Sequence, residues 1–125
     1  LNGVTYGNGL FMAVGNSGTI VTSPDGTTWT SRTLGAFDNL HGISYGNSTF
    51  VTVSDSGTIP TSPDGTTWTS RTSGTSQTLE EVTYGNGTFV TVGGSGTILT
   101  SPDGTTWTIR NSGTSQSLYG VTSTE

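Results

Sequence analysis

The sequence predicts an all-β protein built from small antiparallel sheets, and three observations lead to this prediction. The 125 residues include 28 Thr and 17 Ser but no Lys, a composition that favours strands over helices. The heptapeptide Ser-Pro-Asp-Gly-Thr-Thr-Trp occurs three times, beginning at Ser23, Ser62 and Ser101, always 39 residues apart. Each 39-residue unit also contains four short strand-like stretches separated by turn residues.

The chain divides into three complete units and the start of a fourth. The units are residues 1–39, 40–78 and 79–117, and residues 118–125 repeat the beginning of the pattern. We expect these eight residues to form the first strand of a fourth unit. An internal period of this length is typical of repeat architectures in which each unit packs on its neighbours.

In the first unit the four strands are expected at residues 1–6, 10–15, 19–23 and 27–32. The first two turns, at residues 7–9 and 16–18, contain Gly and Asn, which tolerate a positive φ. The third turn places Pro24 at its second position and Gly26 where a left-handed residue is needed. The longer polar link at residues 33–39 leads to the next sheet.

Four antiparallel strands in about 40 residues match one blade of a β-propeller. The second strand is apolar on both faces, with Phe11 and Ala13 on one and Met12 and Val14 on the other, as stacked blades require. Pro60 replaces an apolar residue in a third strand and is expected to cost one ladder hydrogen bond. One Trp per unit is expected to be buried between blades, with its indole N–H hydrogen-bonded. These are Trp29, Trp68 and Trp107.

The repeated Ser-x-Asp-Gly-x-Thr-Trp resembles the Asp-box, or BNR repeat, of sialidases and related β-propellers, with one residue fewer between Asp and Gly. The resemblance covers all three units and implies a propeller with a structural box on the outer hairpin of each blade. The box carboxylates would then be structural, and such a carboxylate can accept backbone N–H groups within its own turn. The three residues are Asp25, Asp64 and Asp103.

A sialidase-like enzyme would need an arginine triad, but Arg32, Arg71 and Arg110 are 39 residues apart and therefore equivalent. Each follows a Trp at the end of an outer strand, where it is expected to pack on that Trp or to pair with an Asp. Catalysis requires unlike groups that converge on one point. The sequence therefore predicts no catalytic residue and no enzyme, and a fragment of a sialidase-like enzyme is the least favoured alternative.

The candidate ligand-binding residues occupy the second position of the innermost strand, which differs in every unit. They are Asn2, His41, Glu80 and Tyr119. Two interpretations stay open: neutral variation at a solvated position, or a ring of side chains that faces a ligand. Because His41 is the only His and the chain has no Cys, we predict no metal site and no cofactor.

Charge and hydropathy exclude two classes of partner. A net charge of −5 with three Arg excludes nucleic-acid binding, and no apolar run approaches the roughly 18 residues of a membrane-spanning helix. We predict a non-catalytic, extracellular or cell-surface binding and adhesion scaffold, lectin-like, with glycans as partners. The alternative is a purely structural fibre or stalk. Asn47 and Asn86 begin Asn-x-Thr sequons and are candidate glycosylation sites.

Assembly follows from the number of units, because closed propellers have four to eight blades and this chain has three. Either the chain is an excerpt of a longer array, or copies of it self-associate as a homo-oligomer or head-to-tail assembly. We expect that the isolated chain is not a stable monomer, because its end sheets would expose apolar faces.

Overall fold

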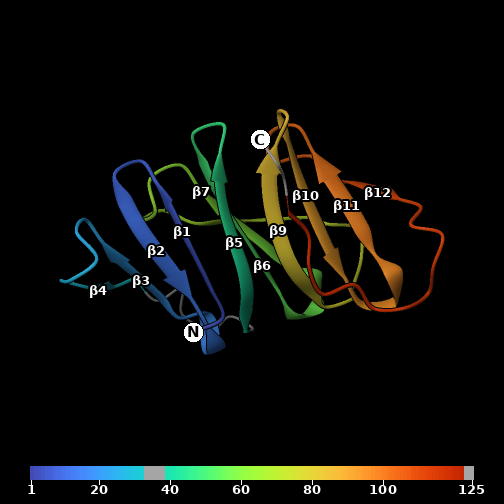
Figure 1. Ribbon diagram of the computed structural model, residues 1–125, viewed down its shortest axis with the longest axis horizontal. Helices are drawn as coiled ribbons and strands as arrows, with labels where there is room; N and C mark the ends of the chain where they lie inside the picture. The colour runs from blue at the N-terminus through green and yellow to red at the C-terminus, as the bar shows by residue number, and fades with distance from the viewer. Residues whose placement is uncertain (33–38, 123–125) are drawn as a thin grey trace.

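The computed structural model describes residues 1–32 and 39–122. In this part of the chain, twelve strands form three separate four-stranded antiparallel sheets, which confirms the predicted all-β class. The helical segments among the described residues are three 3₁₀ turns of three residues each. The sheets lie side by side and do not close into a ring (Figure 1).

Each sheet follows chain order, so every strand pairs with the one before it. The first sheet contains β1 (Gly3–Gly7), β2 (Leu10–Val14), β3 (Ile20–Ser23) and β4 (Thr30–Ser31). The second contains β5 (Leu40–Gly46), β6 (Thr49–Ser54), β7 (Ile59–Ser62) and β8 (Thr69–Arg71). The third contains β9 (Leu79–Gly85), β10 (Thr88–Gly93), β11 (Ile98–Ser101) and β12 (Thr108–Arg110). A 3₁₀ turn joins the second strand of each sheet to the third: η1 (Asn16–Gly18), η2 (Asp55–Gly57) and η3 (Gly94–Gly96).

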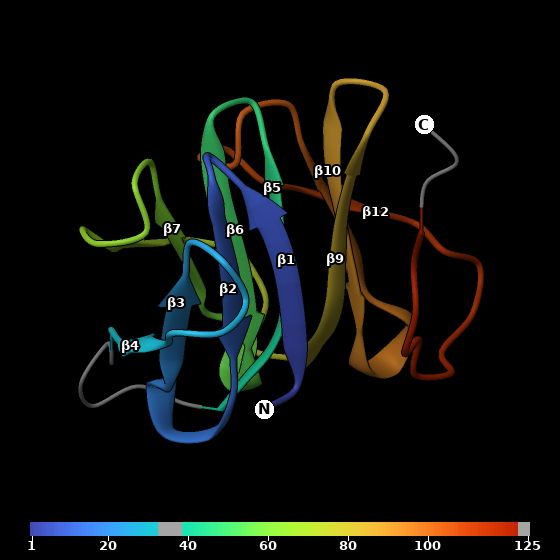
Figure 2. The same ribbon diagram turned by 60° about the vertical axis from the view of Figure 1, so that its left-hand side comes forward.

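The first strands of the three sheets, β1, β5 and β9, are neighbours, and the later strands fan outward (Figures 1 and 2). Apolar side chains fill the space between the sheets in two clusters. Between the first and second sheets lie Met12, Val14, Ile20, Leu40, Ile43 and Phe50. Between the second and third lie Val51, Val53, Ile59, Leu79, Val82, Phe89 and Leu99. Alternate residues of one strand thus serve opposite faces, as the sequence predicts for stacked blades.

A glycine at the end of each inner strand allows this close stacking. A Cβ atom at Gly7 would lie 2.2 Å from the ring of Tyr45 in the second sheet. A Cβ at Gly46 would lie equally close to the ring of Tyr84 in the third sheet. The repeated Tyr-Gly-Asn sequence therefore supplies both the ring and the space that receives the next ring.

The turn in each repeated Ser-Pro-Asp-Gly-Thr-Thr-Trp sequence, which we call the box turn, is built by hydrogen bonds within the turn. The Asp25 carboxylate accepts the backbone N–H groups of Thr27 and Thr28, at 2.8 and 2.9 Å. The Ser23 hydroxyl donates to Asp25 and accepts the N–H of Gly26, at 3.0 and 2.8 Å. Asp64 and Asp103 hold the same pattern in the other sheets. The outer strand begins later than expected, because the first two Thr N–H groups donate to the carboxylate instead of to a neighbouring strand.

The prediction that all three Trp are buried between blades is wrong. Trp68 and Trp107 are half-buried against the two core clusters, and Trp29 is 43% exposed. Each indole lies over its own box turn and donates its N–H to the carbonyl of the box Gly, at 3.0 to 3.3 Å. Trp29 is the most open because no sheet precedes the first one in this structure.

The last described residues, 118–122, form no strand, in contrast to the expected first strand of a fourth unit. The other inner strands each pair with the second strand of their own unit, and among the described residues no such partner follows residue 118. Leu118 nevertheless occupies the position of a sheet start: its N–H donates to the Gly93 carbonyl at 2.9 Å, as that of Leu40 does to Gly15. The remaining residues, 123–125, lie outside the described part of the chain.

Pro60 shortens the ladder, as predicted. The pairing of β6 with β7 covers two residue pairs, whereas the equivalent pairings in the other sheets cover four. The hydroxyl of Thr52 donates to the Pro60 carbonyl at 2.9 Å and links the two strands beside the gap. In the described residues, no helix is long and apolar enough to cross a membrane.

Candidate binding site at the inner ends of the sheets

In the second and third sheets, the variable second position of the inner strand lies at a β-bulge. In the second sheet, Leu40 pairs with Ser54 and Gly42 with Val53, so His41 is the extra residue. The third sheet repeats this shift, with Glu80 as the extra residue. A bulged residue leaves the ladder, and its side chain is turned away from the regular pleat. These two bulges therefore present different side chains at the start of the inner strands, a region that we call the inner end of the sheet.

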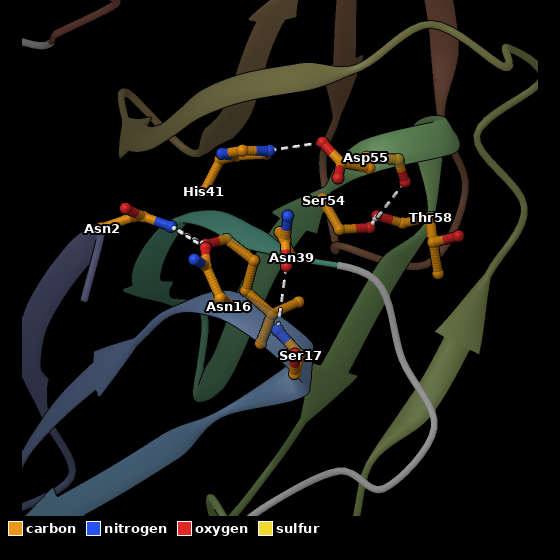
Figure 3. A network of polar contacts seen from close by, with 9 residues as sticks. Asn2, Asn16, Ser17, Asn39, His41, Ser54, Asp55 and Thr58 are labelled. Atoms are coloured by element: carbon orange, nitrogen blue, oxygen red, sulfur yellow. Dashed lines mark hydrogen bonds and ion pairs between the residues drawn. The ribbon is translucent and has the colours of Figure 1, made fainter.

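In the first sheet, Asn2 uses this position to bridge two sheets. Its side-chain amide donates to Asn16 Oδ1 at 3.2 Å and to the Leu40 carbonyl at 2.9 Å (Figure 3). The first bond reaches the 3₁₀ turn of its own sheet, and the second reaches the inner strand of the next sheet. Asn2 is exposed, so part of its amide is open to solvent.

In the second sheet, His41 pairs with Asp55 of η2 (Figure 3). His41 Nε2 lies 2.5 Å from Asp55 Oδ1, and the two side chains are 24% and 37% exposed. Ser54, which precedes Asp55, donates its hydroxyl to the carbonyls of Asp55 and Thr58 and fixes the turn. The pair thus combines an imidazole on the inner strand β5 and a carboxylate on the 3₁₀ turn η2, both partly exposed.

The last residues of two links between sheets accept hydrogen bonds from the 3₁₀ turns. The backbone N–H of Ser17 donates to Asn39 Oδ1 at 3.0 Å, and that of Ser95 approaches Ser117 Oγ at 3.4 Å. Ser17 adopts a left-handed conformation, with a φ of 57°, and Ser56 and Ser95 do the same in the other sheets. Each sheet therefore has a 3₁₀ turn of the same conformation with an exposed Ser at its centre.

The remaining candidate residues do not join this network. Glu80 is partly exposed at its bulge, and Tyr119 is 72% exposed on the segment that follows the third sheet. Glu81, which replaces the Gly of the other units, accepts the N–H of Val82 at 3.1 Å. The structure therefore brings Asn2 and His41 into contact with loop residues of their own sheets, and it leaves Glu80 and Tyr119 open.

Acidic side chains lie at both ends of the strands: Asp55, Glu80 and Glu81 near the start of the inner strands, and Asp25, Asp64 and Asp103 in the box turns at the opposite end. The three Arg lie in or beside the outer strands: Arg71 and Arg110 donate Nε to Thr61 and Thr100 hydroxyls, at 3.0 and 2.9 Å. The Thr partners replace the Trp or Asp partners that the sequence analysis expected for these two Arg.

The box carboxylates are the groups whose protonation the fold alters most clearly. The backbone N–H groups of Thr28 and Thr27, followed by the Ser23 hydroxyl, lower the pKa of Asp25 below its ordinary value of 3.8. The corresponding groups lower the pKa of Asp64 and of Asp103 in the same way. These acids stay ionised at neutral pH and accept hydrogen bonds, which suits a structural part.

The loop partners Asn16, Asp55 and Asn39 were not predicted from the sequence. A signal was present, because the residue after the second strand reads Asn16, Asp55 and Gly94 and so varies in step with the bulged position. Asn47 and Asn86 lie exposed in the hairpins at the other end of the inner strands. Among the described residues, no group of three His, Asp or Glu side chains is placed to hold a metal ion.

Three stacked four-stranded sheets with a 39-residue repeat define a β-propeller-type repeat protein. No protein-family model and no curated protein sequence matches this chain. Solved structures do resemble it. One is described as YCF48 bound to D1 peptide, with a TM-score of 0.70 and 20% identity over 82% of this chain and 36% of that one. Another is YCF48 from Cyanidioschyzon merolae, with a TM-score of 0.69 and 20% identity over 87% and 39%. The chain thus spans well under half of either neighbour, and the likeness shows the propeller fold.

Proposed function

We propose that the chain is a non-catalytic, lectin-like binding scaffold that takes a polar ligand at the inner ends of its sheets. One observation carries this proposal. The box turns recur unchanged in the three sheets, whereas the second position of the inner strand and the first residue of the 3₁₀ turn after the second strand differ in every sheet. Variation at accessible side chains on a recurring framework is what a binding surface requires.

The chemistry of the inner end suits a ligand rich in hydroxyl or amide donors. Carboxylates, side-chain amides and an imidazole are present there, and the cationic side chains lie on the outer strands. A glycan offers many hydroxyl donors, and neighbouring sites on repeated sheets favour weak, multivalent binding. A peptide is the second candidate ligand, because one similar solved structure holds a bound peptide.

Two further features support the absence of catalysis and a place outside the cell. Arg71 and Arg110 are held apart on separate outer strands by their own Thr partners, so they form no convergent anion site. The chain has no Lys and is rich in Ser and Thr, and both sequons are exposed. A fluorogenic sialoside should stay unhydrolysed, and antibody labelling of intact producing cells should detect the protein.

Binding is tested with the variant His41→Ala/Asp55→Ala. Wild type and variant are applied to a glycan array and to a peptide library, and we expect at least tenfold weaker binding by the variant. Thr66→Ala is the matched control, since Thr66 is exposed at the outer turn of the same sheet and its backbone N–H remains. Undiminished binding by the double variant would place the ligand elsewhere. No binding to either library would favour the structural fibre or stalk.

The scaffold also associates with itself, because the first sheet leaves a large apolar face exposed. Leu1, Val4 and Tyr6 are 80%, 65% and 58% exposed on that sheet. Exposed contiguous apolar surface of this kind marks an interaction site in a protein that stays in solution. Sedimentation of the wild-type chain at micromolar concentration should show species heavier than one 12.8 kDa chain.

A further inference from the structure

The face of the first sheet that points away from the second sheet is apolar and open. We call it the free face, and it consists of Leu1, Val4, Ala13, Val21 and Trp29 together with Phe11. Leu1, Val4, Ala13, Val21 and Trp29 line an open groove of about 650 Å³, which Asn2 and Gly3 complete. None of these side chains carries a charge, so removing this surface from water is favourable.

Equivalent faces within the same chain show what covers such a surface. Val4 is 65% exposed, whereas its counterparts Ile43 and Val82 are 5% and 3% exposed. Leu1 is 80% exposed, whereas Leu40 and Leu79 are fully buried. In both interfaces the cover is the opposite face of the preceding sheet. It consists of Met12, Val14 and Ile20 in one interface and of Val51, Val53 and Ile59 in the other.

The third sheet carries its own copy of this covering surface. We call it the far face, and it consists of Val90, Val92 and Ile98, the counterparts of Val51, Val53 and Ile59. Val90 and Ile98 are half-buried, because no fourth sheet lies over them in this structure, whereas Val92 is 4% exposed. One chain therefore carries the free face on its first sheet and the complementary far face on its third sheet.

The box glycine fixes how the two faces would meet. A Cβ at Gly65 would lie 2.6 Å from Met12 Cε, and a Cβ at Gly104 would lie 3.1 Å from Val51 Cγ2. Met12 and Val51 thus occupy the space that the absent side chain of each glycine leaves free. Gly26 has nearly the same φ, 84° against 82° in both others, and a Cβ there would meet only Phe11 of its own sheet, at 3.8 Å. The corresponding space at Gly26 is open, and the counterpart of Met12 and Val51 in the third sheet is Val90.

We propose that the free face binds the far face of a second copy of this chain, with Val90 of one copy over Gly26 of the next. This head-to-tail contact rests on the self-association proposed above and names its two surfaces. It repeats an interface that the chain already forms twice, with Val4 in the place of Ile43 and Val82, and Val90 in the place of Met12 and Val51. Leu118 already holds the place on the third sheet that corresponds to Leu40, so Leu1 of the docked copy, which precedes β1, remains outside.

Two variants separate the faces. Val4→Asp places a carboxylate on the free face, and Val90→Asp places one on the far face. Each variant alone should self-associate at least tenfold more weakly than the wild type does. When the two are mixed, Val4→Asp still offers an intact far face and Val90→Asp an intact free face. Sedimentation velocity should therefore show two monomers when they are separate and a one-to-one dimer when they are mixed.

The controls distinguish the possible failures. Asn8→Asp adds the same charge at an exposed hairpin and should associate as wild type does. Tryptophan fluorescence verifies folding, and Ile98→Asp replaces Val90→Asp if that variant fails to fold. A mixture that stays monomeric, or Val90→Asp that still dimerises alone, overturns the head-to-tail contact but leaves self-association standing. A folded wild-type monomer at micromolar concentration overturns both.

Discussion

The first and second sheets have the same internal geometry, although one is open and the other is covered. The rings of Tyr6 and Phe11 lie 4.7 Å apart with an interplanar angle of 56°, and those of Tyr45 and Phe50 lie 4.6 Å apart at 54°. Phe11 is nevertheless 36% exposed, whereas Phe50 is fully buried. The shape of a sheet therefore comes from its own repeat unit, and its burial comes from its neighbour.

This difference separates two contributions to stability. The box turn forms the same hydrogen bonds in the open first sheet and in the covered second sheet, with Gly26 and Gly65 donating to Ser hydroxyls at 2.8 and 2.7 Å. Each unit thus contributes a local term, and each contact between sheets adds a second term, as in other repeat proteins. Substitutions at equivalent positions can measure the two terms separately.

The largest difference is expected between Phe50→Ala and Phe11→Ala. Both are made in the Val4→Asp chain, so that association does not cover the first sheet. Phe50→Ala should lower the free energy of unfolding by about 3–5 kcal/mol, as the loss of a buried aromatic ring does. Phe11→Ala should cost about 1 kcal/mol, because much of its ring already contacts water. Guanidinium unfolding followed by circular dichroism measures both, and equal losses would contradict the comparison.

A smaller difference is expected for the box tryptophans. Trp68→Ala should cost about 2 kcal/mol, less than a fully buried ring would, because the indole is only half-buried. Trp29→Ala should cost less still in the same non-associating chain, since no sheet covers Trp29. Denaturant midpoints decide the order, and a larger loss for Trp29 would show that the indole acts through its own turn alone.

The sequence contained enough to predict the sheets because their determinants are local. The turn residues, the alternation in β2 and the box carboxylates act within one 39-residue unit, and each recurs three times. Pro60 was equally predictable, since a missing N–H removes a ladder bond in any environment. Repetition thus turned a weak local preference into a firm prediction of sheet number and strand order.

The features that sequence could not supply depend on what lies across a gap. The burial of Trp29 differs from that of Trp68 only because a neighbouring sheet is absent, and the two have the same local sequence. The bulge at His41 is a shift in pairing with β6, and no residue type announces it. The contact of His41 with Asp55 follows from that bulge, so the sequence placed His41 at an inner end but did not identify its partner.

Acid should weaken covered and open sheets alike, because the box carboxylates act within their own turns. Hydrogen bonds from Thr N–H groups lower the pKa of Asp25, Asp64 and Asp103 below 3.8 in the folded chain. The unfolded chain therefore takes up these protons at a higher pH than the folded chain does. The resulting stability is present above about pH 4 and is lost as the pH falls from 3.8 through the lower folded pKa.

Urea midpoints between pH 6 and pH 2.5 measure this loss. The variant with all three Asp replaced by Asn should lose less stability across the same range, because the amide does not titrate. Two-dimensional NMR titration of the carboxyl carbons gives each folded pKa directly. Values for these Asp at or above 3.8 would remove the box from the account of acid sensitivity.

The smallest effect is expected at the inner end, where His41 and Asp55 form a partly exposed pair. Solvent screens such a pair and its side chains lose freedom on contact, so a double-mutant cycle of His41→Ala and Asp55→Ala should give a coupling of about 0–1 kcal/mol. The matching cycle of Asn2→Ala and Asn16→Ala tests the neutral pair on the open sheet, and Asn2→Ala alone also removes the bond to the Leu40 carbonyl. Comparable small couplings in guanidinium unfolding would show that the inner end adds little to folding and is free to vary. A coupling well above 1 kcal/mol for His41 and Asp55 would instead make that pair part of the framework and remove the main argument for binding there.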